Sequence, residues 1–247
     1  MARRVIPDAV KTFLVPFFVL LIAVPVTLLA IGPVATWAST LISHACLTVY
    51  QFNPTIAGVL LGGCWQLLVM FGLHWGLVPL EMTNLSAQGF DPILVLTFAA
   101  SFAQTGVCLA LTLQTKNQKT RSIGIPAVIS SIFGITEPAI YGLSLPRKRP
   151  FMLSCIAAAA GGGILGFFGS AAYMVSGLGI FGIPAMLNPK TGLAWDFYGV
   201  LIAISVAFVL GFTLQYIFGR RFVDTVPEET SVSPTTNEST VQSPAVS

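Results

Sequence analysis

The positively charged residues of this chain fall into short groups that are separated by long apolar segments. Eleven of the twelve Lys and Arg residues belong to four groups, and only Lys190 stands apart. The groups are Arg3, Arg4 and Lys11; Lys116, Lys119 and Arg121; Arg147, Lys148 and Arg149; and Arg220 with Arg221. Because cytoplasmic loops of membrane proteins collect Lys and Arg, this spacing predicts that the chain returns to the cytoplasmic side at each group.

The composition agrees with a chain that is embedded in a bilayer. Hydrophobic residues make up 55% of the 247 residues and charged residues only 9%, whereas a soluble domain carries roughly 25% charged residues. The net charge of +3 is small and scattered, so we expect no nucleic acid partner. The sequence therefore predicts an all-α polytopic membrane protein.

The apolar runs between the basic groups have room for about six transmembrane segments, since each crossing needs about 20 residues. We expect these segments at residues 13–33, 36–52, 56–80, 92–113, 151–172 and 196–218. Ser39, Ser43 and His44 interrupt the second one, so an interfacial helix is the alternative interpretation there. In that case residues 12–115 hold two crossings and long surface segments instead of the four crossings that we favour.

Two further apolar segments are too short to cross a membrane and return. Residues 122–146 number only 25 and lie between two basic groups, which predicts a re-entrant hairpin from the cytoplasmic side. Residues 177–189 are interrupted by Gly and Pro, which predicts a second re-entrant element from the outer side. Two interrupted hairpins in one bundle are typical of a transporter with a site near the midplane of the bilayer.

One carboxylate, Glu137, lies near the middle of the first predicted hairpin, in the sequence F-G-I-T-E-P-A-I-Y-G. A carboxylate at membrane depth is costly by several kcal/mol, so such a residue usually faces a wet cavity and meets a substrate, an ion or a proton. The alternative role is structural, with Thr136 or Glu137 capping the helix that Pro138 begins.

The motif G-I-T-E-P-A-I-Y-G, followed by L-P-R-K-R-P-F, resembles the signature of the membrane-embedded IIC permeases of the phosphoenolpyruvate-dependent sugar phosphotransferase system. N-P-T-I-A-G-V-L-L-G-G-C-W-Q at residues 53–66 and F-G-L-H-W-G at residues 71–76 are similar to segments of its beta-glucoside and sucrose branch. The similarity extends over residues 5–222. It implies a permease component that binds a sugar and translocates it while a IIB domain phosphorylates it.

The resemblance also implies partners and a location. The sugar is expected to be of the beta-glucoside, sucrose or trehalose class. The phosphoryl group would come from a phosphorylated IIB domain outside this chain, which makes the chain a subunit of a sugar phosphotransferase. The implied assembly is a homodimer in the bacterial inner (cytoplasmic) membrane, with both termini in the cytoplasm.

Members of this family carry several more transmembrane helices before the point that corresponds to residue 1. We therefore expect three parts, namely the end of a scaffold part with a crossover segment at residues 1–52, a substrate-binding part at residues 53–222, and a disordered cytoplasmic tail or linker at residues 223–247. The Pro-, Glu-, Thr- and Ser-rich sequence from Val226 onward supports the tail, because it cannot bury enough apolar area to fold.

The resemblance assigns the sugar site to two segments. Glu137 is expected to accept hydrogen bonds from sugar hydroxyls, and it is a candidate general base for the hydroxyl that is phosphorylated. His74 is expected to be a second sugar ligand, although a lone histidine can equally be an interhelical hydrogen-bonding residue. Gly134 and Thr136 are expected to contact the sugar through backbone or hydroxyl groups. Trp75 is an interface anchor, a core residue or a platform for the apolar face of the sugar.

The remaining sequence features favour structural roles. Cys46, Cys64, Cys108 and Cys155 lack the spacing of metal ligands, so we expect no metal and no cofactor. The run A-A-A-A-G-G-G-I-L-G at residues 157–166 follows no strand and has no Lys-Ser/Thr pair, so it predicts a close helix–helix contact rather than a phosphate loop.

Two other functions remain open from the sequence. In a proton- or ion-coupled secondary transporter, Glu137 would be the coupling carboxylate and the sugar would not be phosphorylated. Alternatively, the chain is a non-transporting fragment of a split permease gene, in which case it would not bind sugar by itself.

Overall fold

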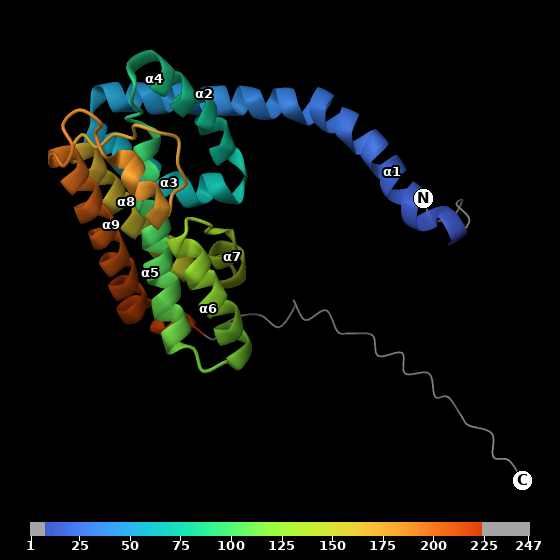
Figure 1. The fold of residues 1–247 in the computed structure, drawn as a ribbon. Helices are drawn as coiled ribbons and strands as arrows, with labels where there is room; N and C mark the ends of the chain where they lie inside the picture. Colours follow the sequence, from blue (N-terminus) through green and yellow to red (C-terminus); the bar gives the residue numbers. More distant parts are fainter. Residues whose placement is uncertain (1–7, 224–247) are drawn as a thin grey trace, which may run out of the picture.

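The computed structural model describes residues 8–223, except for the side chains of a few residues in the first two helices and of Phe222. Within this range the chain is helical and contains two isolated β-bridges but no strand (Figure 1). The α-helices are α1 (Asp8–Val26), α2 (Gly32–Phe52), α3 (Pro54–Met70), α4 (Val78–Gln88), α5 (Ala99–Gln114), α6 (Gln118–Ile132), α7 (Glu137–Ala139), α8 (Arg149–Phe167) and α9 (Trp195–Leu214).

Short 3₁₀ and π segments connect or extend these helices. They lie at Thr27–Ile31, Leu73–Leu77, Leu94–Thr97, Ile140–Ser144, Leu145–Arg147, Ile180–Met186, Gln215–Gly219 and Arg220–Phe222. The predicted tail at residues 223–247 lies outside the described residues except for Val223.

Four helical stretches are long and apolar enough to cross a membrane. They are Pro16–Val34, Leu94–Gln114, Arg149–Phe167 and Trp195–Gly219. These four coincide with the spans predicted at residues 13–33, 92–113, 151–172 and 196–218. The helical fold and four of the six predicted spans are therefore confirmed by length and composition.

The span predicted at residues 56–80 is not one helix. The helix α3 ends at Met70, and Gly72 then adopts a left-handed backbone with φ of 72°. A 3₁₀ segment from Leu73 to Leu77 follows, and α4 begins at Val78 with Pro79 in its first turn. Gly permits the left-handed turn and Pro favours a helix start, so these two residues break the apolar run into three pieces.

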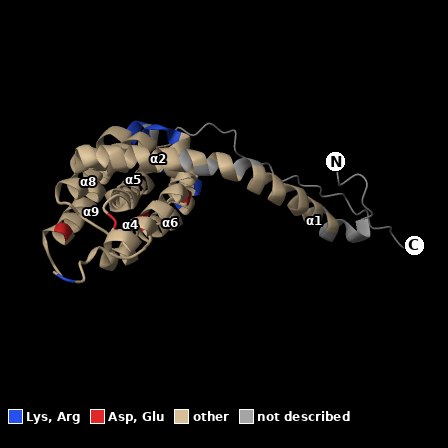
Figure 2. Cartoon of the chain, turned by 90° about the horizontal axis from the view of Figure 1, so that it is seen from above, with Lys and Arg blue, Asp and Glu red and all other residues tan. Residues whose placement is uncertain are grey.

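The bundle is built around α5, α8 and α9, with α3 packed against α8 and α6 against α5 (Figure 1). The helices α1 and α2 are joined into one long rod, and α1 extends away from the bundle (Figure 2). The rod contacts the rest of the chain through α2, which packs on α3 and on the segment Leu73–Leu77. The exposed apolar side chains of α1, from Phe17 to Val26, are those of a helix that meets lipid or another helix.

Small residues allow α3 and α8 to approach at backbone distance. A side-chain carbon added at Gly58 would overlap the carbonyl oxygen of Gly162, and one added at Gly62 would lie 2.5 Å from the carbonyl oxygen of Ala158. A third such contact joins Gly166 to the carbonyl of Pro54. The helix–helix contact predicted for residues 157–166 is thus confirmed.

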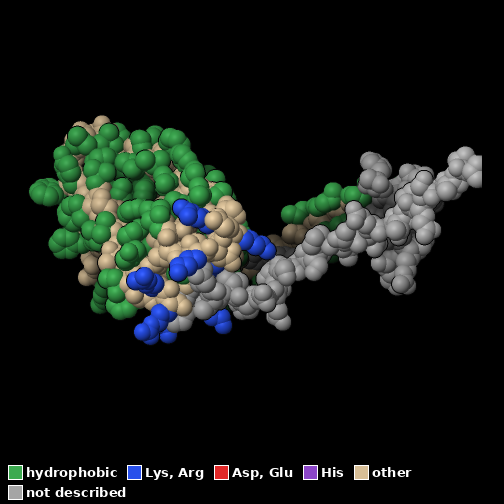
Figure 3. Space-filling view, turned by 90° about the horizontal axis from the view of Figure 1, so that it is seen from below, with side chains coloured by type: hydrophobic (Ala, Val, Ile, Leu, Met, Phe, Trp, Pro, Cys, Tyr) green, Lys and Arg blue, Asp and Glu red, His purple; other side chains and the backbone are tan. Residues whose placement is uncertain are grey.

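Three of the four basic groups meet at one end of the bundle. Gln114, just before the first of them, donates a hydrogen bond to the carbonyl oxygen of Tyr216 at 2.8 Å. Arg147 is buried and donates to the carbonyl oxygen of Val223 at 2.6 Å and to the hydroxyl of Thr120 at 3.2 Å. Figure 3 shows Lys and Arg side chains gathered on this face. Lys190 precedes α9, whose other end leads into this basic face, so Lys190 lies at the opposite end of that helix.

The same hydrogen bonds define the shape of residues 122–146. The helix α6 leads away from the basic face, a turn at residues 133–136 reverses the chain, and α7 with Ile140–Ser144 leads back to Arg147. The contact of Arg147 with Thr120 joins the two ends of this helical hairpin. Arg147 is therefore a structural residue that ties the hairpin to the end of α9.

Candidate functional site

The turn of the helical hairpin holds three of the predicted site residues. Gly134 has a φ of 91°, which a residue with a side chain rarely adopts. Thr136 is buried at the N-cap position of α7, but its side chain makes no capping hydrogen bond. Glu137 is exposed, and no side chain or backbone group of the described residues donates a hydrogen bond to its carboxylate. The geometry thus gives no support to a capping role for this carboxylate.

The other two predicted residues, His74 and Trp75, lie in the 3₁₀ segment that follows α3. His74 is half-buried, whereas the Trp75 side chain is 70% exposed, and their rings are 5.5 Å apart. The Leu73–Leu77 segment packs on α2, which holds it beside the bundle.

The structure brings the Glu137 turn and the His74 segment together. Glu137 is close enough to His74 for a weak electrostatic interaction between the two side chains. Tyr141, one turn after Glu137, donates a hydrogen bond to the carbonyl oxygen of Met70 at 2.9 Å, and Met70 is the last residue of α3. Two segments that are more than 60 residues apart in the sequence therefore form one polar region.

Two neighbouring residues of α3 have buried polar atoms without partners. Among the described residues, Trp65 Nε1 and Gln66 Oε1 are buried and have no hydrogen-bond partner. The Trp65 and His74 rings pack edge to face with their centroids 5.7 Å apart. The amide nitrogen of Gln66 donates a hydrogen bond to the carbonyl oxygen of Ala100 at 3.1 Å. Because an unpaired buried polar group costs about 1–3 kcal/mol, such a set indicates a place that water or a polar ligand completes.

Sequence reasoning passed over Trp65 and Gln66, although both stand in the segment at residues 53–66 that carries the family resemblance. The sequence shows only an amide beside an indole inside an apolar run, and their burial is known from the structure. Gln104 on α5 is a similar case, since its amide donates to Ser144 at 2.8 Å while its own carbonyl oxygen has no partner among the described residues.

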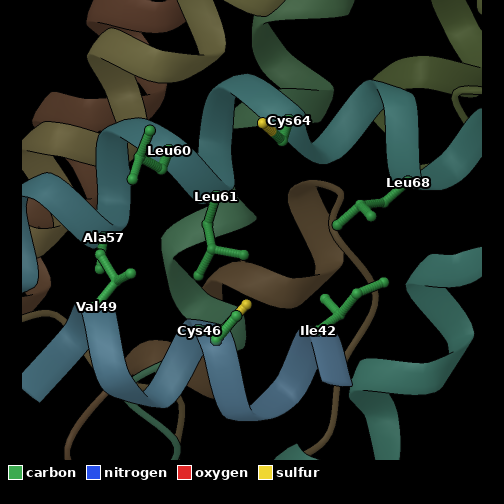
Figure 4. A pocket seen from close by; sticks show the side chains of 9 residues that line it. Ile42, Cys46, Val49, Ala57, Leu60, Leu61, Cys64 and Leu68 are labelled. Carbon is green, nitrogen blue, oxygen red and sulfur yellow. The ribbon is translucent and has the colours of Figure 1, made fainter. Parts of the chain in front are cut away.

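The hollow between α2 and α3 is a different kind of site. Its volume is about 220 Å³, and its lining comes from apolar side chains together with the thiols of Cys46 and Cys64 (Figure 4). A sugar needs directed hydrogen-bond donors and acceptors, so this hollow cannot orient one. In the part of the chain that the structure describes, no three His, Cys, Asp or Glu residues converge to hold a metal ion.

Two acidic residues are buried together near the start of α5. Asp91 accepts hydrogen bonds from the Asn84 side chain at 2.6 Å and from the backbone of Leu94 at 2.7 Å. Glu81 on α4 is only 4% exposed and lies close to this charge. Burial, and secondly the charge of Asp91, raise the pKa of Glu81 to about 7.

This pair predicts a pH-dependent stability. The folded chain binds the Glu81 proton more tightly than the unfolded chain, whose pKa is near 4.5, so the free energy of unfolding should fall as the pH rises toward about 7. Glu81→Gln removes this dependence. We expect the variant and the natural chain to melt at similar temperatures at pH 5, and the variant to melt higher at pH 8, in detergent thermal-unfolding assays. Parallel curves for both proteins would show that Glu81 ionises normally.

The fold defines a class, namely a multi-helix membrane protein with helices long and apolar enough to cross a bilayer. The family model of the EIIC component of the phosphotransferase system matches residues 1–161. The chain therefore belongs to the phosphotransferase system EIIC family, whose members are integral proteins of the bacterial inner membrane. No solved structure matches it.

Characterised relatives agree with this assignment. A beta-glucoside-specific EIIBCA component from Halalkalibacterium halodurans is 54% identical over 99% of the chain and 38% of its own length. A beta-glucoside-specific EIIBCA component from Dickeya chrysanthemi is 36% identical over 88% of the chain and 34% of its length. A sucrose-specific EIIBC component from Salmonella typhimurium is 33% identical over 87% of the chain and 47% of its length. The chain thus spans about a third to a half of the length of these relatives.

Proposed function

We propose that this chain provides the sugar-binding and sugar-translocating region of a phosphotransferase permease of the beta-glucoside type. The observation that carries the proposal is that the hairpin turn with Glu137 contacts the end of α3, where the His74 ring and the unpaired indole nitrogen of Trp65 lie next to each other. Membership of the EIIC family and the beta-glucoside and sucrose specificities of the relatives also support this proposal.

The proposed recognition follows from the chemistry of these groups. An ionised carboxylate accepts several hydrogen bonds in one plane, which suits adjacent hydroxyls on a pyranose ring. His74 and the indole nitrogen of Trp65 supply further hydrogen-bonding groups, and the exposed ring of Trp75 offers a flat apolar surface. Gly134 and Thr136 shape the turn that presents the carboxylate. Glu137 can also take the proton of a sugar hydroxyl during phosphorylation.

The proposed topology places the basic face in the cytoplasm, where it meets a phosphorylated IIB domain. The gathering of three basic groups at one end supports this orientation. In this arrangement, the hairpin at residues 122–146 enters the bilayer from the cytoplasm and brings Glu137 to membrane depth. Residues 177–189 enter from the outer side, residues 53–222 form the binding part, and residues 1–52 connect it to a scaffold.

Transport by the intact system tests this function. In membrane vesicles that contain the complete phosphotransferase relay, we expect a labelled beta-glucoside to accumulate as its phosphate, and uptake to require phosphoenolpyruvate. A protonophore should leave this uptake unchanged. Accumulation of free sugar that a protonophore abolishes would instead identify a proton-coupled transporter.

A further inference from the structure

The turn of the hairpin approaches a second loop of the bundle at backbone distance. A side-chain carbon built on Gly134 would lie 2.6 Å from the backbone nitrogen of Gly179, and one built on Gly179 would overlap the carbonyl group of Phe133. Gly179 belongs to residues 177–189, the segment predicted as the second re-entrant element. We call the approach of Phe133 and Gly134 to Leu178 and Gly179 the tip contact.

Two side-chain interactions reinforce the tip contact. The rings of Phe133 and Phe181 are stacked with their centroids 5.3 Å apart and an angle of 20° between their planes. Ser101, which is buried on α5, donates a hydrogen bond to the carbonyl oxygen of Leu178. The turn is thus held against a loop that is itself fixed to a membrane-spanning helix.

The Glu137 carboxylate depends on this support for its position. It receives no hydrogen bond from another described residue, and it follows Gly134 by only three positions. The backbone of the turn, rather than a partner on the side chain, therefore determines where the carboxylate lies. Any displacement of the turn moves the carboxylate relative to His74.

We propose that Gly179 is a positioning residue for sugar binding, which acts by holding the Glu137 turn through the tip contact. This inference rests on the proposed function of Glu137. Position 179 requires a glycine because there is no space for a side chain. Its backbone conformation does not require one, since any residue can adopt its φ of −102°. The loop also contains Gly177, where an added side-chain carbon would meet no atom within 4 Å.

The test compares Gly179→Ala with its neighbour Gly177→Ala in the intact system. Since a displacement of about 1 Å in an organised site can cost about 10²-fold, we expect Gly179→Ala to raise the dissociation constant for the sugar by at least about tenfold. Because the added carbon clashes with the backbone of Phe133, the melting temperature should also fall, so the dissociation constant is measured at a temperature where the variant is folded. The amount of sugar bound at saturation by the folded protein should stay near that of the natural protein. Gly177→Ala should bind with unchanged affinity.

A merely structural contact would give a different pattern. It would lower the number of binding sites or the melting temperature and leave the dissociation constant of the folded fraction unchanged, and this result would overturn the proposal. Ser101→Ala serves as a second variant, because it removes the hydrogen bond to Leu178 without adding an atom. We expect it to weaken binding about threefold or more, and unchanged affinity in both variants would also overturn the proposal.

A parallel measurement on Glu137→Gln separates the two proposals. If Glu137→Gln loses binding and Gly179→Ala keeps it, the sugar site is correct and the positioning role is wrong. If Glu137→Gln binds as the natural protein does, the site assignment fails and the positioning role fails with it. Loss of affinity in both variants, with Gly177→Ala unaffected, supports both.

Discussion

Replacing Glu137 by Gln is expected to lower the affinity for sugar by about 10²-fold or more and to abolish phosphoenolpyruvate-dependent uptake. The amide keeps the shape of the side chain but loses its charge and one acceptor oxygen. Hydrogen bonds to a charged group contribute about 1.5–3 kcal/mol each, so the loss of two such bonds accounts for this factor. Because the Glu137 side chain is exposed and its carboxylate accepts no hydrogen bond within the described part of the chain, the variant should melt at the natural temperature.

The matched control for this prediction is Glu81→Gln. It makes the same chemical change at a carboxylate that is buried beside Asp91 on a different helix, α4. We expect its sugar affinity at neutral pH to match that of the natural protein. Isothermal titration with an aryl beta-glucoside measures both variants. If Glu137→Gln takes up and phosphorylates sugar normally, the site must be sought elsewhere in the bundle.

The sequence alone was enough to predict the features of the fold that depend on charge and on segment length. The spacing of the basic groups predicted six apolar spans, of which four are long and apolar enough to cross a membrane. The short distance from Arg121 to Arg147 predicted that the chain reverses between them. The small residues at 157–166 predicted a close helix–helix contact, and the structure identifies α3 as the partner. These inferences succeeded because each depends on a property of one segment, such as its hydropathy, its length or the size of its side chains.

Features that depend on two distant segments were not predicted. The tip contact joins Gly134 to Gly179, which are 45 residues apart in the sequence. No feature of either local sequence predicts that the two glycines lie together. The unpaired atoms of Trp65 and Gln66 become conspicuous only when their burial is known. Arg147 seemed to be one of three equivalent basic residues, yet it alone is buried among the hydrogen-bond acceptors of Thr120 and Val223.

The largest effect on folding is expected from Gly58→Ala. The added carbon would overlap the carbonyl group of Gly162, so two backbones must move apart and no flexible side chain can yield instead. Overpacking of a core costs about 1–3 kcal/mol even where side chains can adjust, and a backbone clash lies at or above the upper end of that range. We therefore expect a markedly lower melting temperature and little monodisperse protein in size-exclusion chromatography.

The stability of Gly58→Ala also tests the position of the His74 segment, because α3 leads directly into that segment. Its control is Gly63→Ala on the same helix, where the added carbon meets the side chain of Ala159 at 3.1 Å, a contact that a small shift relieves. This variant should melt within a few degrees of the natural protein. If Gly58→Ala is equally stable, α3 and α8 cannot be as close as the structure has them. The placement of His74 beside Glu137, which depends on the position of α3, would then lose its support.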